Sequence, residues 1–153
     1  MGLKERLRGQ LQGKLVALDT APFIYFLEIF PKYSPLVDPF FEALEVGEVY
    51  AVTSVLTLVE VLVHPIRRRN PELAGQYRQI LLSSDHLRMA PVSLDIAEEA
   101  ARLRAKFNLR APDAIQFATA ITSGTDFFLT NDRQFLKVSG EGPEVLVLDR
   151  LLE

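Results

Sequence analysis

The segment Pro112–Phe135, PDAIQFATAITSGTDFFLTNDRQF, decides how the chain is expected to fold. Pro112 suits the first turn of a helix, where its missing N–H group is not needed, and Gly124 suits the end of that helix. The apolar run FFLT at 127–130 comes directly after the turn and predicts a strand. The segment therefore predicts a helix that leads into a strand, which is the repeating unit of α/β domains.

Strand-like and helix-like segments alternate along the rest of the chain as well. Further strands are expected over 14–19, 49–53, 87–90 and 145–148, and further helices over 22–29, 35–44, 54–64, 71–83 and 95–107. Pro65 is expected to stop the third of these helices, and the spacing of Asp95 and Glu98 resembles a capping box at the start of the last. The alternation predicts an α/β domain with a mainly parallel sheet.

Composition limits the class of protein. The chain has 153 residues, 48% of them hydrophobic and 24% charged, which suits a single globular domain over 1–153. Its net charge of −3 does not indicate nucleic-acid binding through bulk charge, so RNA would need a local basic patch or a metal. Cysteine is absent and only two histidines are present, which excludes disulfides and thiolate sites and disfavours a histidine-rich zinc site.

No apolar run reaches the roughly 18 residues that a membrane span needs, and the N-terminus lacks the apolar core of a signal peptide. The expected compartment is therefore the cytoplasm, with no membrane partner. Leu3, Leu7 and Leu11 recur every four residues, so residues 1–13 are expected to contain a short amphipathic helix. A solvated or packing extension is the favoured interpretation, and a helix that binds a partner is the alternative.

Four acidic residues occupy positions that folding alone explains poorly. Asp19 ends the apolar run LVALD, Glu60 interrupts VLTLVEVLV, Asp113 follows Pro112, and Asp132 follows FFLTN. Ionised carboxylates seldom enter apolar settings unless a positive charge offsets the loss of hydration. Because ligands bind beyond the carboxyl ends of parallel strands, Asp19 and Asp132 are expected to share one edge of the sheet.

Clustered carboxylates at such an edge suit a hard divalent cation. Mg²⁺ and Mn²⁺ prefer carboxylate oxygen, and a bound ion stabilises charge on an attacked phosphate and lowers the pKa of water. Thr130 and Asn131 precede Asp132 and are placed to orient a carboxylate or a metal-bound water. The acidic set therefore favours metal-dependent cleavage of phosphodiester bonds.

Each acidic residue also has a structural explanation. Asp19 suits a turn, Glu60 suits the surface of an amphipathic helix, and Asp113 suits the positive end of a helix dipole. Asp132 suits the cap of a short helix that runs to Leu136. His64 and His86 are expected to be structural, and Asp149 has no evident partner in the sequence.

Three segments resemble the PIN-domain family of nucleases: LDTAPFIYFLE at 18–28, TSVLTLVEVL at 53–62, and the segment 112–135. In size the chain resembles the VapC-type toxin ribonucleases of that family. The resemblance implies a three-layer α/β/α fold, Mg²⁺- or Mn²⁺-dependent cleavage of RNA, a cognate antitoxin and a homodimer. It implies that Asp19, Glu60, Asp113 and Asp132 hold the metal and are catalytic, and that Thr130 supports them.

One departure from the family pattern follows Asp113. Gln116 and Phe117 stand where many members have smaller aliphatic residues, so packing or substrate access is expected to change while the metal site stays untouched. Two other functions are weighed against the nuclease. The first is a catalytically inactive PIN fold that binds RNA or serves in assembly. The second, a phosphatase with Asp19 as nucleophile, is disfavoured because LDTAP lacks a second aspartate two residues after the first.

Two further groups of residues leave alternatives open. Aromatic residues crowd the first third of the chain, where core and dimer packing are favoured over a groove for an amphipathic antitoxin helix. Basic residues gather at 67–69, at 102–110 and around Asp132, where solvated surface is favoured over contacts to RNA phosphates.

Overall fold

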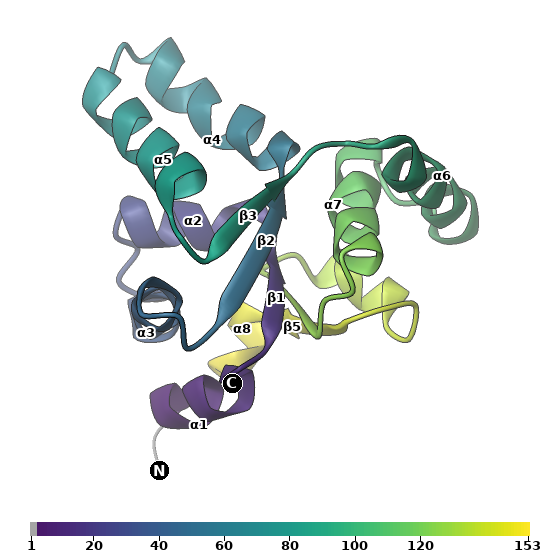
Figure 1. Cartoon of the computed structure of the whole chain (residues 1–153), viewed down its shortest axis with the longest axis horizontal. Helices are drawn as coiled ribbons and strands as arrows, with labels where there is room; N and C mark the ends of the chain where they lie inside the picture. Colours follow the sequence, from purple (N-terminus) through teal and green to yellow (C-terminus); the bar gives the residue numbers. More distant parts are fainter. Residues whose placement is uncertain (1–2) are drawn as a thin grey trace.

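A parallel five-stranded sheet forms the centre of the computed structural model, which describes residues 3–153 (Figure 1). The strand order is β3-β2-β1-β4-β5, and every neighbouring pair is parallel. The strands are β1 (Leu15–Leu18), β2 (Tyr50–Ser54), β3 (Leu87–Ala90), β4 (Phe127–Thr130) and β5 (Glu144–Val147). The predicted mainly parallel sheet is confirmed, and each predicted strand lies within one residue of its observed bounds.

Helices cover both faces of this sheet, as Figure 1 shows. One face carries α1 (Leu3–Leu11), α2 (Thr20–Leu27), α3 (Ser34–Glu45), α4 (Val55–Arg67), α5 (Pro71–Ser83) and the short α8 (Leu148–Leu151). The other face carries α6 (Leu94–Phe107), α7 (Ala111–Thr122) and the 3-10 helix η1 (Arg133–Val138). Each layer buries its own apolar cluster against the strands, so the predicted three-layer α/β/α fold is confirmed.

Two local predictions are wrong. Helix α6 is capped by Ser93, whose Oγ accepts a hydrogen bond from the Ile96 N–H group at 3.2 Å, and not by a box built from Asp95 and Glu98. Helix α4 continues through Pro65 and ends at Arg67. Pro65 has no N–H group to donate to the carbonyl oxygen four residues earlier, so one helical hydrogen bond is lost, while its ring is buried.

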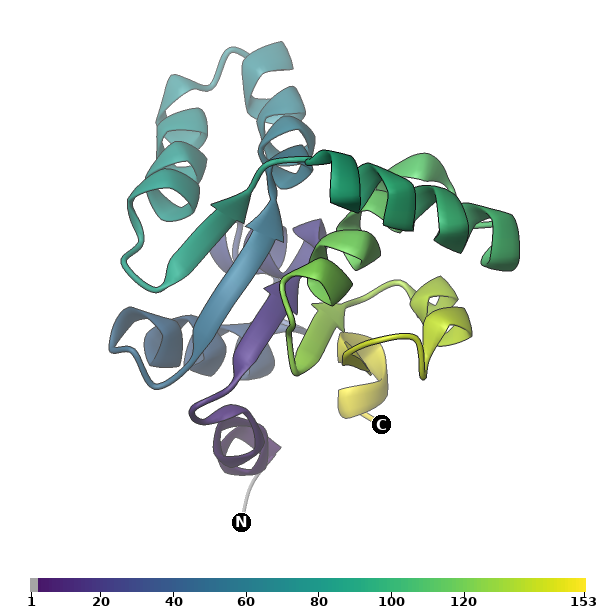
Figure 2. The same ribbon diagram turned by 45° about the vertical axis from the view of Figure 1, so that its right-hand side comes forward.

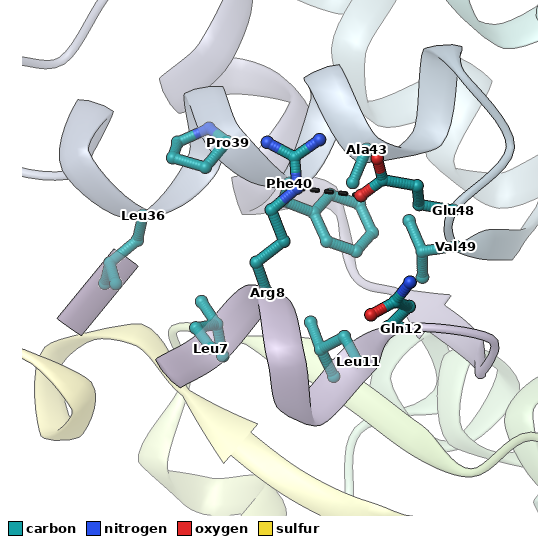
Figure 3. A pocket seen from close by; sticks show the side chains of 10 residues that line it. All are labelled: Leu7, Arg8, Leu11, Gln12, Leu36, Pro39, Phe40, Ala43, Glu48 and Val49. Carbon is teal, nitrogen blue, oxygen red and sulfur yellow. Dashed lines mark hydrogen bonds and ion pairs between the residues drawn. The ribbon is translucent and has the colours of Figure 1, made fainter. Parts of the chain in front are cut away.

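Helix α1 packs as an extension of the core. Leu7 and Leu11 are buried against α3, and the Arg8 Nε donates to Glu48 Oε2 at 2.8 Å across the ring of Phe40 (Figure 3). The space left between α1 and α3 is about 10 Å³, close to the minimum that one water molecule needs. The contact is therefore packing and not a ligand pocket, while residues 1 and 2 of the predicted extension lie outside the described residues.

The register of the strands places two carboxyl ends side by side. Leu18 at the end of β1 pairs with Leu129 of β4, and the strand arrows in Figure 2 point the same way. Asp19 and Asp132 therefore leave the sheet from one edge, as the parallel arrangement predicts. Among residues 3–153, no helix is long and apolar enough to cross a membrane.

Candidate active site

Asp19 lies at the carboxyl end of β1 and is tied to β4 through its side chain. It is the N-cap of α2, and its Oδ1 accepts from the Thr20 N–H group at 2.8 Å. Its Oδ2 accepts from the Thr130 hydroxyl at 2.7 Å. This hydrogen bond fixes the orientation of the Asp19 carboxylate, and it is a contact through which Thr130 can support the acidic residue as predicted.

Asp132 follows on the same edge. Its backbone N–H group donates to Thr130 Oγ1 at 3.0 Å, and its Oδ1 accepts from the Gln134 N–H group at 2.9 Å. Asp132 is therefore the N-cap of η1, which confirms its structural explanation. Its second carboxylate oxygen takes no part in that cap, so the structural role leaves one oxygen for a ligand.

Glu60 projects from the second turn of α4. Its Oε1 accepts from the Thr20 hydroxyl at 3.0 Å, and the Gln116 amide Nε2 lies 3.5 Å from the same oxygen. The apolar surroundings in the sequence suggest burial, but Glu60 is exposed. The reason is that α4 turns an apolar stripe of Val55, Val59, Val63 and Ile66 to the outside, and Val59 keeps 59% of its surface exposed.

Asp113 begins α7 and is the most buried of the four, with 9% of its surface exposed. The Arg110 Nε donates to Asp113 Oδ2 at 3.1 Å, while the Arg110 side chain remains 73% exposed. This ion pair raises the pKa of Arg110, with smaller contributions from the charges of Asp132 and Glu60. Arg110 therefore lies within the field of three of the four acidic residues.

The electrostatics of Asp19 reveal the crowding of charge at this edge. Burial raises the pKa of Asp19 to about 6, hydrogen bonds from Thr130 and Thr20 oppose the rise, and repulsion from Glu60 and Asp113 adds to it. The structure thus brings the four acidic residues near one another. A divalent cation would relieve this repulsion, and four carboxylates are a donor set that Mg²⁺ or Mn²⁺ prefers.

These side chains supply the oxygen donors that a divalent cation prefers, but their spacing does not form a ready metal site. Within residues 3–153, no three His, Cys, Asp or Glu side chains are spaced as a group that would hold a metal ion. Glu60 is exposed on α4 and Arg110 occupies one oxygen of Asp113. The side chains would therefore have to draw together, and the Arg110 contact to adjust, for several carboxylates to share one ion.

The raised pKa of Asp19 predicts a pH-dependent stability. In the folded protein Asp19 holds its proton up to pH about 6, whereas its ordinary pKa is 3.8. Its contribution to stability is therefore complete below pH about 4 and is lost as the pH rises through 6, by at most about 3 kcal/mol. Urea unfolding in EDTA from pH 4 to 7 should show that Asp19→Asn, which keeps an oxygen for the cap, gains stability relative to wild type as the pH rises. An equal pH dependence in both proteins would contradict the burial of this carboxyl group.

Three residues contact the acidic set: Thr20 and Gln116 do not stand out in the sequence as part of a site, whereas Arg110 belongs to the basic group at 102–110. Thr20 and Gln116 both approach Glu60, and Arg110 pairs with Asp113. Gln116 was expected to leave the site untouched, and its amide instead reaches the carboxylate of Glu60. The only signal for Gln116 in the sequence is an amide among the small and apolar residues of 114–121, where a buried polar group needs a partner.

A polar network also surrounds Asn131, between Thr130 and Asp132. Its amide donates to Tyr25 Oη at 3.0 Å, and its Oδ1 accepts from the Asp149 N–H group at 2.8 Å. Asp149 in turn accepts from Tyr33 Oη at 2.7 Å and pairs with Lys32, so the sequence-based view that Asp149 lacks a partner is wrong. These contacts fasten the β4–η1 turn to α2 and α8.

Comparison with known proteins identifies the fold family. The PIN domain family model matches residues 16–141, which is most of the chain. The chain therefore belongs to the PIN domain family, a family of nucleases, and the resemblance noted in the sequence is confirmed. Among curated proteins, none matches the chain significantly.

Solved structures agree on the fold. A chain of a toxin–antitoxin complex from Klebsiella pneumoniae is 23% identical with a TM-score of 0.64, over 87% of this chain and 97% of that one. A chain of VapBC-5 from Mycobacterium tuberculosis, a member of the VapBC family of toxin–antitoxin systems, is 25% identical with a TM-score of 0.58, over 88% and 98%. A chain of VapBC2 from Rickettsia felis, bound to a DNA fragment from its promoter, is 14% identical with a TM-score of 0.66, over 87% and 98%.

Proposed function

We propose that this PIN domain is a Mg²⁺- or Mn²⁺-dependent endoribonuclease that hydrolyses phosphodiester bonds of RNA. The observation that carries the proposal is the gathering of Asp19, Glu60, Asp113 and Asp132 at one edge: Glu60 and Asp113 raise the pKa of Asp19, and the Thr130 hydroxyl contacts both Asp19 and Asp132. Membership of a nuclease family supports it. Clustered like charges reduce the stability of a fold, and they are typical of functional sites.

Each residue has a definite part in this proposal. The four carboxylates would hold the cation, which supplies Lewis-acid stabilisation of the charge on an attacked phosphate. Thr130 keeps the Asp19 carboxylate oriented through its 2.7 Å hydrogen bond. Arg110 is exposed beside Asp113 and is suited to contact a phosphate of the RNA backbone, which positions the strand without reading its sequence.

The direct test is cleavage of a mixed RNA pool with Mg²⁺, with Mn²⁺ and with EDTA. We expect cleavage with either metal and its loss in EDTA. Cleavage that persists in EDTA would contradict metal dependence.

The second candidate is a catalytically inactive PIN fold that binds RNA or serves in assembly. The spacing of the acidic side chains, which forms no ready three-ligand group among residues 3–153, is the observation in its favour. Titration calorimetry with Mn²⁺ separates the two functions. Absence of binding at millimolar Mn²⁺ would favour the inactive module, and binding would favour the nuclease.

Regulation by a partner is the remaining part of the proposal. We infer that the chain is the toxin of a toxin–antitoxin pair, acts on cytoplasmic RNA and forms a homodimer. The toxin–antitoxin complexes among the similar structures support the antitoxin. A groove of about 590 Å³ is lined by apolar side chains such as Phe26, Phe41 and Ile80 and by polar ones such as Gln76 and Asp85, and this mixture is suited to an amphipathic helix. The exposed stripe on α4 offers an apolar surface for self-association.

A further inference from the structure

A chain of buried polar side chains links the end of β1 to Glu60. The Thr53 hydroxyl donates to the Leu18 carbonyl oxygen at 2.8 Å, and the hydroxyls of Thr53 and Thr57 lie 2.7 Å apart. The Gln116 Nε2 donates to Thr57 Oγ1 at 2.9 Å. All three side chains are buried, with at most 3% of their surface exposed. This series of hydrogen bonds therefore runs from the sheet through α4 to α7 within the protein interior.

Donor and acceptor roles in this chain can be assigned from the number of hydrogens. Thr53 has one hydroxyl hydrogen and gives it to Leu18, so Thr57 must be the donor toward Thr53. Thr57 can then only accept from its other neighbour, which requires the NH₂ group of Gln116 on that side. The orientation of the Gln116 amide is thus fixed by the backbone carbonyl of the residue before Asp19.

This orientation directs Gln116 toward Glu60. The same Nε2 atom that donates to Thr57 lies 3.5 Å from Glu60 Oε1, and this oxygen also accepts from the Thr20 hydroxyl at 3.0 Å. Two donors therefore approach Oε1, and neither contacts Oε2. A carboxylate held by one oxygen in this way presents the other to a ligand.

We propose that Gln116 is a positioning residue that, through Thr57 and Thr53, sets which oxygen of Glu60 faces the acidic edge. The inference rests on the proposed metal-dependent nuclease and adds a residue of α7 that acts through Glu60. A residue that orients a metal ligand is expected to influence metal affinity about 10- to 100-fold. A residue that only fills the core would influence folding stability without a specific link to Glu60.

The test measures Mn²⁺ affinity by calorimetry, with thermal unfolding to confirm that each variant is folded. Gln116→Met keeps the volume but removes the amide, and we expect a loss of affinity of about tenfold or more. Thr57→Val leaves Gln116 in place but removes its anchor, and we expect a smaller loss in the same direction. Thr119→Val is the matched control, because Thr119 is equally buried on α7 and bonds only to the Ile115 carbonyl oxygen. Its Mn²⁺ affinity should equal that of wild type.

A double-variant cycle separates positioning from packing. If Gln116 acts through Glu60, adding Gln116→Met to a Glu60→Gln protein should cause no further loss of Mn²⁺ affinity. The same loss in both backgrounds, or an affinity of Gln116→Met within twofold of wild type, would overturn the inference alone. Failure of the wild-type protein to bind Mn²⁺ would overturn the proposed function and the inference with it.

Discussion

Asp113→Asn is expected to reduce metal-dependent RNA cleavage by more than about a hundredfold. Asp113 is the most buried of the four acidic residues, and as a direct ligand in the proposed metal site it should matter more than outer partners, whose loss costs about 10- to 100-fold. Asparagine keeps the shape and one oxygen, so the change removes charge and little else. The measurement is the initial rate of cleavage of a mixed RNA pool in saturating Mn²⁺.

The same substitution should leave the fold intact. It removes a charge that helps to raise the pKa of Asp19, and it gives up an ion pair whose Arg110 side is exposed to solvent, so stability should change by less than about 1 kcal/mol. Asp126→Asn is the matched control, since Asp126 precedes β4 at the opposite edge of the sheet and accepts from the Leu15 N–H group at 2.9 Å. Full activity of Asp113→Asn, or an equal loss in Asp126→Asn, would remove Asp113 from the site.

Phe117→Ala is expected to have the largest effect on stability, a loss of about 3–5 kcal/mol. The ring of Phe117 is fully buried between α7 and the sheet, 5.2 Å from the centre of Phe128 and 6.2 Å from that of Phe135. A loss of this size is a large part of the total stability of an ordinary domain, about 5–15 kcal/mol. Urea unfolding gives the difference directly.

A second phenylalanine supplies the control for this substitution. Phe30→Ala removes the same atoms from a ring that is 39% exposed and that contacts Tyr25 at a centroid distance of 4.9 Å. Its cost should be well below that of Phe117→Ala, because the site is already open to water and leaves no closed cavity. Similar losses from both substitutions would show that the core around Phe117 collapses to fill the space.

Much of the fold can be predicted from the sequence because its signals are local. Apolar runs such as FFLT, together with glycine and proline residues at the ends of helices and in turns, locate the strands and helices within a few residues. The shared edge of Asp19 and Asp132 also follows from local reasoning, since parallel strands end together. Local signals fail where two neighbouring candidates compete, as at the α6 cap, where Ser93 and not Asp95 accepts the hydrogen bond.

The finer structure of the candidate site could not be predicted, because its contacts join distant segments. Glu60 meets Gln116 across 56 positions, and nothing near either residue signals the other. The exposure of Glu60 depends on which side of α4 faces the sheet, and an apolar run on nearly all sides of a helix does not specify this. Asp149 similarly finds Tyr33 only through the docking of α8 beside α3.

The position of β1 in the sheet has a consequence during synthesis. β1 lies between β2 and β4, and the Asp19 carboxylate meets its Thr130 partner 111 positions later in the chain. Before residue 113 has been translated, β1 has a neighbour on one side only and the acidic edge lacks Asp113, Thr130 and Asp132. Pairings of such long sequence separation are made late. The nascent polypeptide therefore cannot assemble the proposed catalytic centre until Asp132 has been synthesised, so the proposed nuclease activity would be withheld from the ribosome through the synthesis of residues 1–131.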